Sequence, residues 1–163
     1  MQNALLLLLF WLSLEGVAGA QPQELGGRPT PEAYALVVGS NPGGAGQKTL
    51  RYAELDAERV AALLGELSGV PASHARLVKR PTPEELLAAL DEIGARLRSE
   101  AQAGRQSLLF FYYSGHARAE ALNLGDGELA LGRLREKLLA LPTTLTVVVL
   151  DACQSGAFSR IKG

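Results

Sequence analysis

Short apolar segments alternate with amphipathic segments of helical period along this chain, and this alternation constrains its fold most strongly. The apolar segments are rich in β-branched or aromatic residues, and we predict strands at 34–39, 75–79, 107–113 and 145–150. Parallel strands return through helices, which cover both faces of the sheet. We therefore predict an α/β fold with a mostly parallel sheet.

The helical segments carry start and end signals. A first helix, ending near residues 68–69, is predicted by apolar residues at i, i+3, i+4 and i+7: Val60, Leu63, Leu64 and Leu67. A second opens with a Thr82 cap, Pro83 at its first position and Glu85 closing a capping box. Its predicted buried stripe is Leu86, Leu90, Ile93 and Leu97. A short strand at 121–124 and a turn at 125–127 precede a third helix at 131–139.

The first twenty residues are typical of a secretory signal peptide. An almost unbroken apolar run at 4–14 is followed by small residues, so we expect cleavage after Ala20. A membrane anchor is the alternative, but the run falls short of the roughly 18 to 20 residues that cross a bilayer. We expect residues 21–33 to form a flexible leader and 34–163 the domain. An exported protein, periplasmic or extracellular and without a stable membrane span after signal removal, is the expectation.

Composition excludes several classes of function. The net charge of -1 does not suit a charge-driven binder of nucleic acid. A single Cys excludes an internal disulfide framework, and with two His it leaves too few ligands for a zinc site. We therefore expect no metal and no cofactor.

Two residues with catalytic potential follow predicted strands. His116 comes after the strand at 107–113, and Cys153 after the strand at 145–150. The carboxyl ends of neighbouring parallel strands meet at one edge of a sheet, where sites form. An imidazole beside a thiol favours the nucleophilic thiolate and can protonate a leaving amine. Alternatively, Cys153 is a small buried apolar residue and His116 a hydrogen-bonded loop residue; their joint placement favours a catalytic dyad.

Two other features, a Gly-rich segment and His74, are not predicted to take part in catalysis or ligand binding. The Gly-rich segment 39–49 resembles a phosphate-binding loop, but Gln47 stands where that motif needs Gly before Lys48. We expect a flexible loop over the strand ends that borders a substrate groove. His74 lies in a turn with no acid or thiol nearby in sequence, and we expect it on the solvated surface.

The segments Tyr113-Ser114-Gly115-His116 and Asp151-Ala152-Cys153-Gln154-Ser155-Gly156 resemble the His and Cys motifs of caspase-like cysteine peptidases, bacterial caspases and metacaspases above all. The second segment is similar to the metacaspase pattern D-x-C-x-S-G. The segment 50–57 also looks like the family's counterpart, so the resemblance covers most of 34–163. It implies a caspase-like three-layer sandwich.

The resemblance implies a cysteine endopeptidase that acts on protein or peptide substrates. Cys153 would be the nucleophile and His116 the general acid/base, while the backbone N–H groups of Cys153 and Ala117 would form the oxyanion hole. The family usually has Gly where this chain has Ala117. If that position required a positive φ, Ala would add strain of about 1 kcal/mol.

Asp151 matches the position of an acid that lines the primary specificity pocket in metacaspase-like enzymes, where it would pair with Arg or Lys before the scissile bond. Equally, Asp151 could accept backbone N–H bonds and cap the loop after its strand. A second acid could come from Glu120, Asp126 or Glu128, and the sequence does not choose among them.

Caspase-like domains normally continue beyond the Cys motif, so the resemblance implies that this chain is the large-subunit portion and lacks the C-terminal strands. An open sheet edge and exposed apolar surface are the expected consequences. Its partner would be its own C-terminal half or a second chain, and Arg160 and Lys162 are candidate processing sites. A caspase-fold interaction module without catalysis, or an inactive fragment, is the alternative.

Overall fold

The computed structural model describes residues 30–44, 46–118 and 120–152. The predicted signal peptide, most of the predicted leader, and Cys153 with the rest of its motif lie outside the described residues. None of the helices in the described part of the chain combines the length and the apolar character that a membrane crossing needs.

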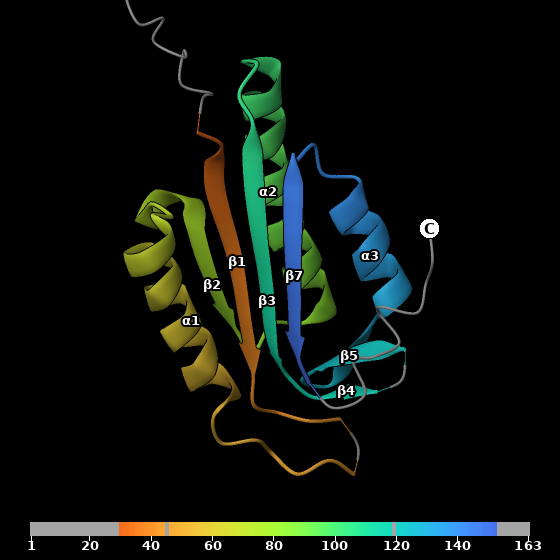
Figure 1. Ribbon diagram of the computed structural model, residues 1–163. Coiled ribbons are helices and arrows are strands. Elements are labelled where there is room, and N and C mark those ends of the chain that lie inside the picture. Colours follow the sequence, from red (N-terminus) through yellow and green to blue (C-terminus); the bar gives the residue numbers. More distant parts are fainter. Residues whose placement is uncertain (1–29, 45, 119, 153–163) are drawn as a thin grey trace, which may run out of the picture.

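The main sheet has four parallel strands in the order β2-β1-β3-β7 (Figure 1). They are β1 (Glu32–Ser40), β2 (Ala75–Lys79), β3 (Ser107–Gly115) and β7 (Leu145–Asp151). All four predicted strands are confirmed. The leader was predicted to extend to residue 33, but β1 already begins at Glu32. Pairing with the longer β3 extends it, because Glu32 lies opposite Ser107 and donates its N–H to Gln106 O at 2.8 Å.

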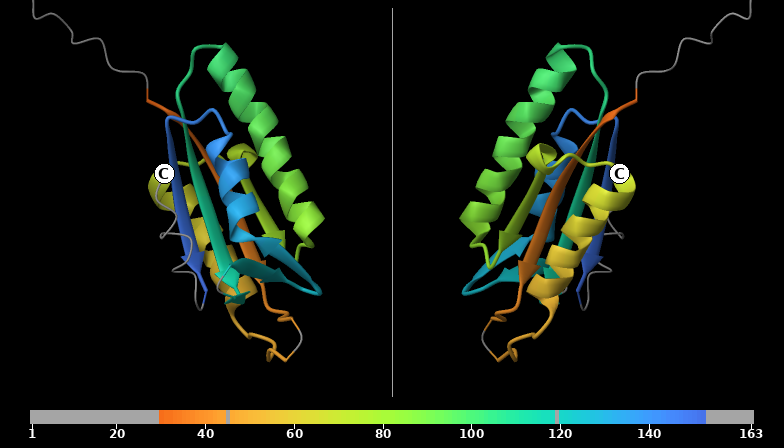
Figure 2. Two further views of the ribbon diagram at one scale, coloured as in Figure 1. Left: turned by 90° about the vertical axis from the view of Figure 1, so that its right-hand side faces the viewer. Right: turned by 90° about the vertical axis from the view of Figure 1, so that its left-hand side faces the viewer.

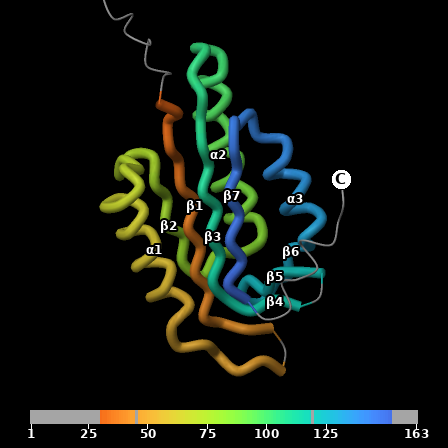
Figure 3. The backbone as a smooth tube through the Cα atoms, in the orientation of Figure 1, coloured from red at the N-terminus to blue at the C-terminus, as the bar shows by residue number. Residues whose placement is uncertain are grey.

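Helices cover both faces of this sheet, which makes the three-layer α/β sandwich that was predicted (Figure 2). One face carries α1 (Ala53–Ser68), and the other carries α2 (Pro83–Gln102) and α3 (Leu131–Leu139). The backbone trace shows each helix lying between strands in sequence, as parallel connections require (Figure 3).

Helix α2 begins and packs as its sequence predicts. The Thr82 hydroxyl accepts from the Glu85 N–H at 3.2 Å, and the Glu85 carboxylate accepts from the Thr82 N–H at 2.8 Å. This reciprocal pair satisfies backbone donors that a helix start leaves free. All four residues of its predicted stripe are buried: Leu86, Leu90, Ile93 and Leu97.

The stripe predicted for α1 is partly wrong. Leu63 and Leu67 are 50% and 78% exposed, whereas Ala53 and Ala57 are buried against the sheet. The reason is a close approach between the helix and β1, where a Cβ on Gly39 would lie 2.7 Å from Glu54 Cα. Small side chains allow this approach, so they form the contact face. The helix ends at Ser68, and Gly69 adopts φ +66° as the expected C-terminal glycine.

A small antiparallel sheet follows β3 directly. Its strands are β4 (Ala117–Arg118), β5 (Ala121–Leu124) and β6 (Gly127–Ala130), in that order. Only β5 was predicted, and the turn after it is confirmed. His116 is the residue that joins the two sheets. At the opposite end of the main sheet, His74 stacks on Tyr34 with ring centroids 4.2 Å apart, so the prediction that His74 is a solvated surface residue is wrong.

Candidate active site

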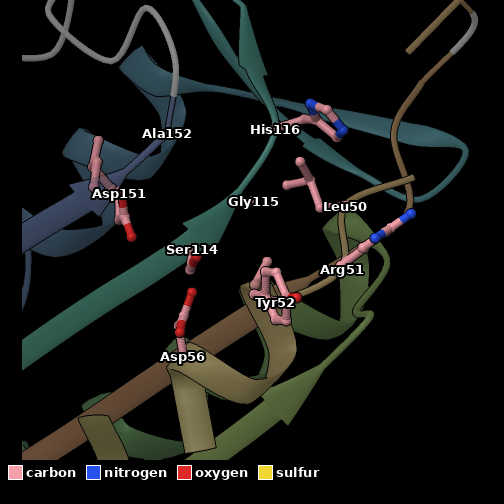
Figure 4. A pocket seen from close by; sticks show the side chains of 11 residues that line it. Leu50, Arg51, Tyr52, Asp56, Ser114, Gly115, His116, Asp151 and Ala152 are labelled. Atoms are coloured by element: carbon pink, nitrogen blue, oxygen red, sulfur yellow. The ribbon is translucent and has the colours of Figure 1, made fainter. Parts of the chain in front are cut away.

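The carboxyl ends of β3 and β7 lie side by side, which is the arrangement that the predicted dyad requires. Ser114 pairs with Asp151 in the last register position of the two strands. A cleft of about 530 Å³ opens at this edge, between the strand ends and the start of α1 (Figure 4). Its lining includes His116, Ser114, Asp151, Ala152, Tyr52 and Asp56.

The His116 ring is held by the loop between β1 and α1. Its Nε2 lies 2.8 Å from Lys48 O, and because a carbonyl only accepts, Nε2 must donate. Gly43 lies against the same ring, since a Cβ there would come within 2.8 Å of His116 Cδ2. In the neutral ring this contact fixes the proton on Nε2 and leaves Nδ1 as the proton acceptor. The described lining of the cleft begins at Leu50 and includes no residue of the segment 39–49, which was predicted to border a groove, so the contribution of this loop is to orient His116.

That loop is fastened at its base to α1 and β2. Asn41 and Glu54 exchange two hydrogen bonds, from Asn41 N to the Glu54 carboxylate at 3.3 Å and from Glu54 N to Asn41 Oδ1 at 3.2 Å. Arg80 Nε donates to the same carboxylate at 2.6 Å. The Arg80 hydrogen bond is the main reason why the pKa of Glu54 lies below its ordinary value. The Glu54 side chain is 12% exposed, whereas the Arg80 side chain is 65% exposed, so only the carboxylate is shielded from water.

Cys153 lies outside the described residues, and Ala152, which directly precedes it, lines the cleft together with His116. The structure therefore brings His116 and Ala152 to one cleft, and the dyad itself stays a prediction.

Ala117, the predicted oxyanion donor, is 5% exposed and begins β4. Among the described residues other than glycine, Arg80 alone has a positive φ. Ala117 is therefore in ordinary backbone geometry, and the strain considered for Ala at this position does not arise.

Asp151 is exposed at the end of β7 and lines the cleft. The Tyr112 hydroxyl donates to its carboxylate at 3.3 Å. Burial, and to a lesser degree the negative charge of Asp151, raise the pKa of Tyr112, so the phenol keeps its proton for this bond. The Tyr112 hydroxyl thus holds the Asp151 carboxylate in position.

Asp56 is a cleft residue that sequence reasoning missed, as it missed Arg51 and Tyr52. It lies in the first turn of α1, and Figure 4 shows Asp56 and Asp151 directed toward Ser114 from two sides. Arg59 is its nearest ion-pair partner at 3.6 Å. The signal was its place just after the loop that follows β1, within the segment 50–57 already singled out.

The three acids considered as a second pocket carboxylate, Glu120, Asp126 and Glu128, are absent from the described lining of the cleft. Glu128 instead accepts from Asn123 Nδ2 at 3.1 Å. In the described part of the chain, His, Cys, Asp and Glu side chains do not gather in threes as a metal site requires.

Comparison with known proteins agrees with this geometry. Residues 32–162 match the sequence profile of the caspase domain. A search of curated protein sequences finds no match. The profile covers most of the chain, including both strand ends that form the cleft. The chain therefore belongs to the caspase-domain family of cysteine peptidases.

Proposed function

We propose that this protein is a cysteine endopeptidase that cleaves peptide bonds after Arg or Lys. The observation that carries the proposal is that His116, the residue before Cys153 and two carboxylates line the same cleft. His116 would act as the general acid/base. The position of Ala152 brings the chain to the cleft just before the nucleophile Cys153. The two carboxylates would bind a positively charged side chain of the substrate.

In the proposed reaction, His116 Nδ1 accepts the Cys153 proton, and the thiolate attacks the carbonyl carbon of the scissile bond. The protonated His116 then gives its proton to the leaving amine as the C–N bond breaks, which leaves a thioester on Cys153. Water, deprotonated by the same imidazole, hydrolyses the thioester and restores the thiol. Lys48 O supports this cycle because it accepts from Nε2 in both protonation states of the ring.

The tetrahedral intermediate carries a negative oxygen that needs hydrogen-bond donors. The backbone N–H groups of Ala117 and Cys153 are the proposed donors. The ordinary backbone geometry of Ala117 supports this role, since it removes the reason to expect a misaligned N–H at this position.

The proposed preference for Arg or Lys rests on Asp56 and Asp151. Both line the cleft, and Ser114 lies between them with a side-chain hydroxyl (Figure 4). A guanidinium inserted there could donate to both carboxylates, which a neutral or acidic side chain could not do. Tyr112 would hold Asp151 in place while the substrate binds.

Export remains part of the proposal. The apolar run and the small residues before Gln21 support cleavage there. Mass determination of the protein secreted by a suitable host would give a mature N-terminus at Gln21, whereas a chain that retains Met1 in the cell would contradict it.

The experiment that tests the activity is covalent labelling by peptidyl ketones that carry Arg or Asp next to the reactive carbon. We expect the Arg probe to label Cys153 faster than the Asp probe, and labelling to disappear in Cys153→Ala and His116→Ala. The chain is tested as it stands and with any coding sequence that follows it. If Cys153 reacts no faster than a free thiol in either form, the peptidase proposal fails, and an interaction module replaces it.

A further inference from the structure

The peptide unit between His116 and Ala117 is held by two hydrogen bonds to its carbonyl oxygen, His116 O. The Tyr113 hydroxyl donates to His116 O at 2.7 Å, and the Asn123 N–H donates to the same oxygen at 2.9 Å. The Tyr113 hydroxyl also lies 2.8 Å from Asn123 O, so one phenol proton serves two carbonyls. This buried phenol links the end of β3 to β5, and the reaction proposed above does not use it.

Tyr113 is fully buried, at 0% exposure, within the core formed with α2 and α3. Burial raises the pKa of the phenol well above its ordinary value, so it stays a neutral donor wherever the protein is folded. The hydroxyl fits because residue 115 is glycine, where a Cβ would lie 2.5 Å from the Tyr113 oxygen. Tyr113 and Gly115 therefore act together to place a donor beneath His116.

Backbone geometry connects this donor to the oxyanion site. In a trans peptide the C=O and the following N–H point in opposite directions within one plane. Ala117 lies opposite Leu122, and the bond from Asn123 N to His116 O flanks this pair. In an antiparallel ladder such a pair does not exchange its own hydrogen bonds, so the Ala117 N–H points away from β5. Whatever fixes the His116 carbonyl thus fixes the direction of the Ala117 N–H.

We propose that Tyr113 is a positioning residue that sets the direction of the Ala117 N–H by holding the carbonyl of the same peptide unit. This inference rests on the proposed peptidase function. Tyr113 lies behind the peptide and does not touch the substrate, so its effect is confined to stabilisation of the negative oxygen. It leaves the ionisation of the thiol to His116.

Two reagents separate these effects in the unmodified chain and its Tyr113→Phe variant. The Cys153 thiol adds reversibly to the carbonyl carbon of a peptidyl-arginine aldehyde. The tetrahedral adduct carries an oxygen that would accept a hydrogen bond from the Ala117 N–H. Iodoacetamide alkylates the thiolate by displacement of iodide and builds no such oxygen. We expect the variant to bind the aldehyde about tenfold to a hundredfold more weakly, since loss of a whole oxyanion donor costs about 100-fold to 1,000-fold. The rate and pH profile of alkylation should change by less than about twofold.

Tyr34→Phe is the matched control. Tyr34 is also buried, its hydroxyl donates to Glu100 at 3.3 Å, and it lies at the opposite end of the same sheet. Its loss should change neither reaction. The corresponding peptidyl alcohol, which occupies the cleft without forming an adduct, should bind the Tyr113→Phe variant as tightly as it binds the unmodified chain.

Equal losses in aldehyde binding and alkylation would overturn the inference, because Tyr113 would then act on the dyad or on the whole fold. Unchanged aldehyde binding would overturn it as well. If the unmodified chain forms no aldehyde adduct, the proposed function fails, and amide hydrogen exchange decides the positioning alone. We then expect the Asn123 amide to exchange about tenfold faster in Tyr113→Phe while the Val38 amide stays unchanged, and equal Asn123 rates would refute the link.

Discussion

The two faces of the main sheet are packed differently, and the cleft depends on both. The face under α2 and α3 buries large side chains in one continuous core, including Tyr34, Leu36, Leu109, Phe111 and Tyr113. The face under α1 buries mainly small residues, Ala35, Val37, Ala57 and Val70, and leaves Phe110 and Tyr112 half-buried. On β7, Leu145 and Val149 are 53% and 46% exposed.

Because of this difference, the two ends of the cleft are held in place by different parts of the core. The His116 end is tied through Tyr113 to the large core. The acidic end lies on the face covered by α1. There the Tyr112 hydroxyl donates to Asp151, and Asp56 belongs to the first turn of α1. We therefore expect core substitutions to affect the whole protein and substitutions on the α1 face to affect recognition first.

The largest expected effect contrasts the two faces directly. Leu90, 1% exposed in the large core, and Leu64, half-buried under α1, are each replaced by Ala. Leu90→Ala should lower the free energy of unfolding by about 3 kcal/mol, because it leaves a cavity in a packed core. Leu64→Ala should cost about 1 kcal/mol, since less surface is buried there. Urea unfolding followed by circular dichroism measures both, and equal losses would contradict the difference between the faces.

The next effect concerns recognition. Asp56→Asn and Asp151→Asn should each lower kcat/KM for a peptide with Arg before the scissile bond by about tenfold to a hundredfold, or about 1.4 to 2.7 kcal/mol. Thermal unfolding should change little, because both side chains are at the cleft surface. A peptide with citrulline in place of Arg is the control, since it keeps the shape without the charge. If kcat/KM falls by the same factor for both peptides, the carboxylates do not recognise the positive charge of the substrate.

A smaller effect depends on pH and tests how the His116 loop is fastened. The pKa of Glu54 lies below its ordinary value, so the carboxylate stabilises the fold above pH about 4.5, and this contribution is lost as the pH falls through the lowered pKa. Glu54→Gln should cost about 1 to 2 kcal/mol at pH 7, the scale of a charged hydrogen bond. The cost should shrink at pH 3. Glu66→Gln, on the exposed side of α1, serves as the control and should stay within about 0.5 kcal/mol. An identical cost of Glu54→Gln at both pH values would refute this electrostatic fastening.

The smallest effect tests the corrected orientation of α1. Leu67 is 78% exposed, so Leu67→Gln should change the free energy of unfolding by less than about 0.5 kcal/mol. A loss of about 2 kcal/mol or more, measured by urea unfolding, would mean that the originally predicted stripe is the buried one.

Features contained within one element and the parallel sheet could be predicted from sequence, whereas side-chain contacts between elements could not. The capping box and the stripe of α2 depend on neighbours along the helix, and both are confirmed. The orientation of α1 is decided by its close approach to Gly39, which the spacing of leucines does not show. Strand β4 has only two residues, which is too short for a periodic pattern, whereas β6 was missed although it is as long as β5.

The candidate site divides in the same way. His116 was singled out because it follows a predicted strand, and Asp151 because its segment resembles the Cys motif of caspase-like peptidases. Both residues line one cleft because β3 and β7 pair side by side. Asp56 enters the cleft only because α1 begins over the strand ends. The partner of His116 is a backbone carbonyl, Lys48 O, and since every residue has one, no side chain in the sequence could mark it.

The most direct test of the central claim is to identify the bonds that the protein cuts in an unbiased peptide library. We expect cleavage after Arg and Lys, with new termini detected by mass spectrometry and none produced by Cys153→Ala. Products that persist in Cys153→Ala, or cuts in the library that show no preference for a basic residue, would contradict it.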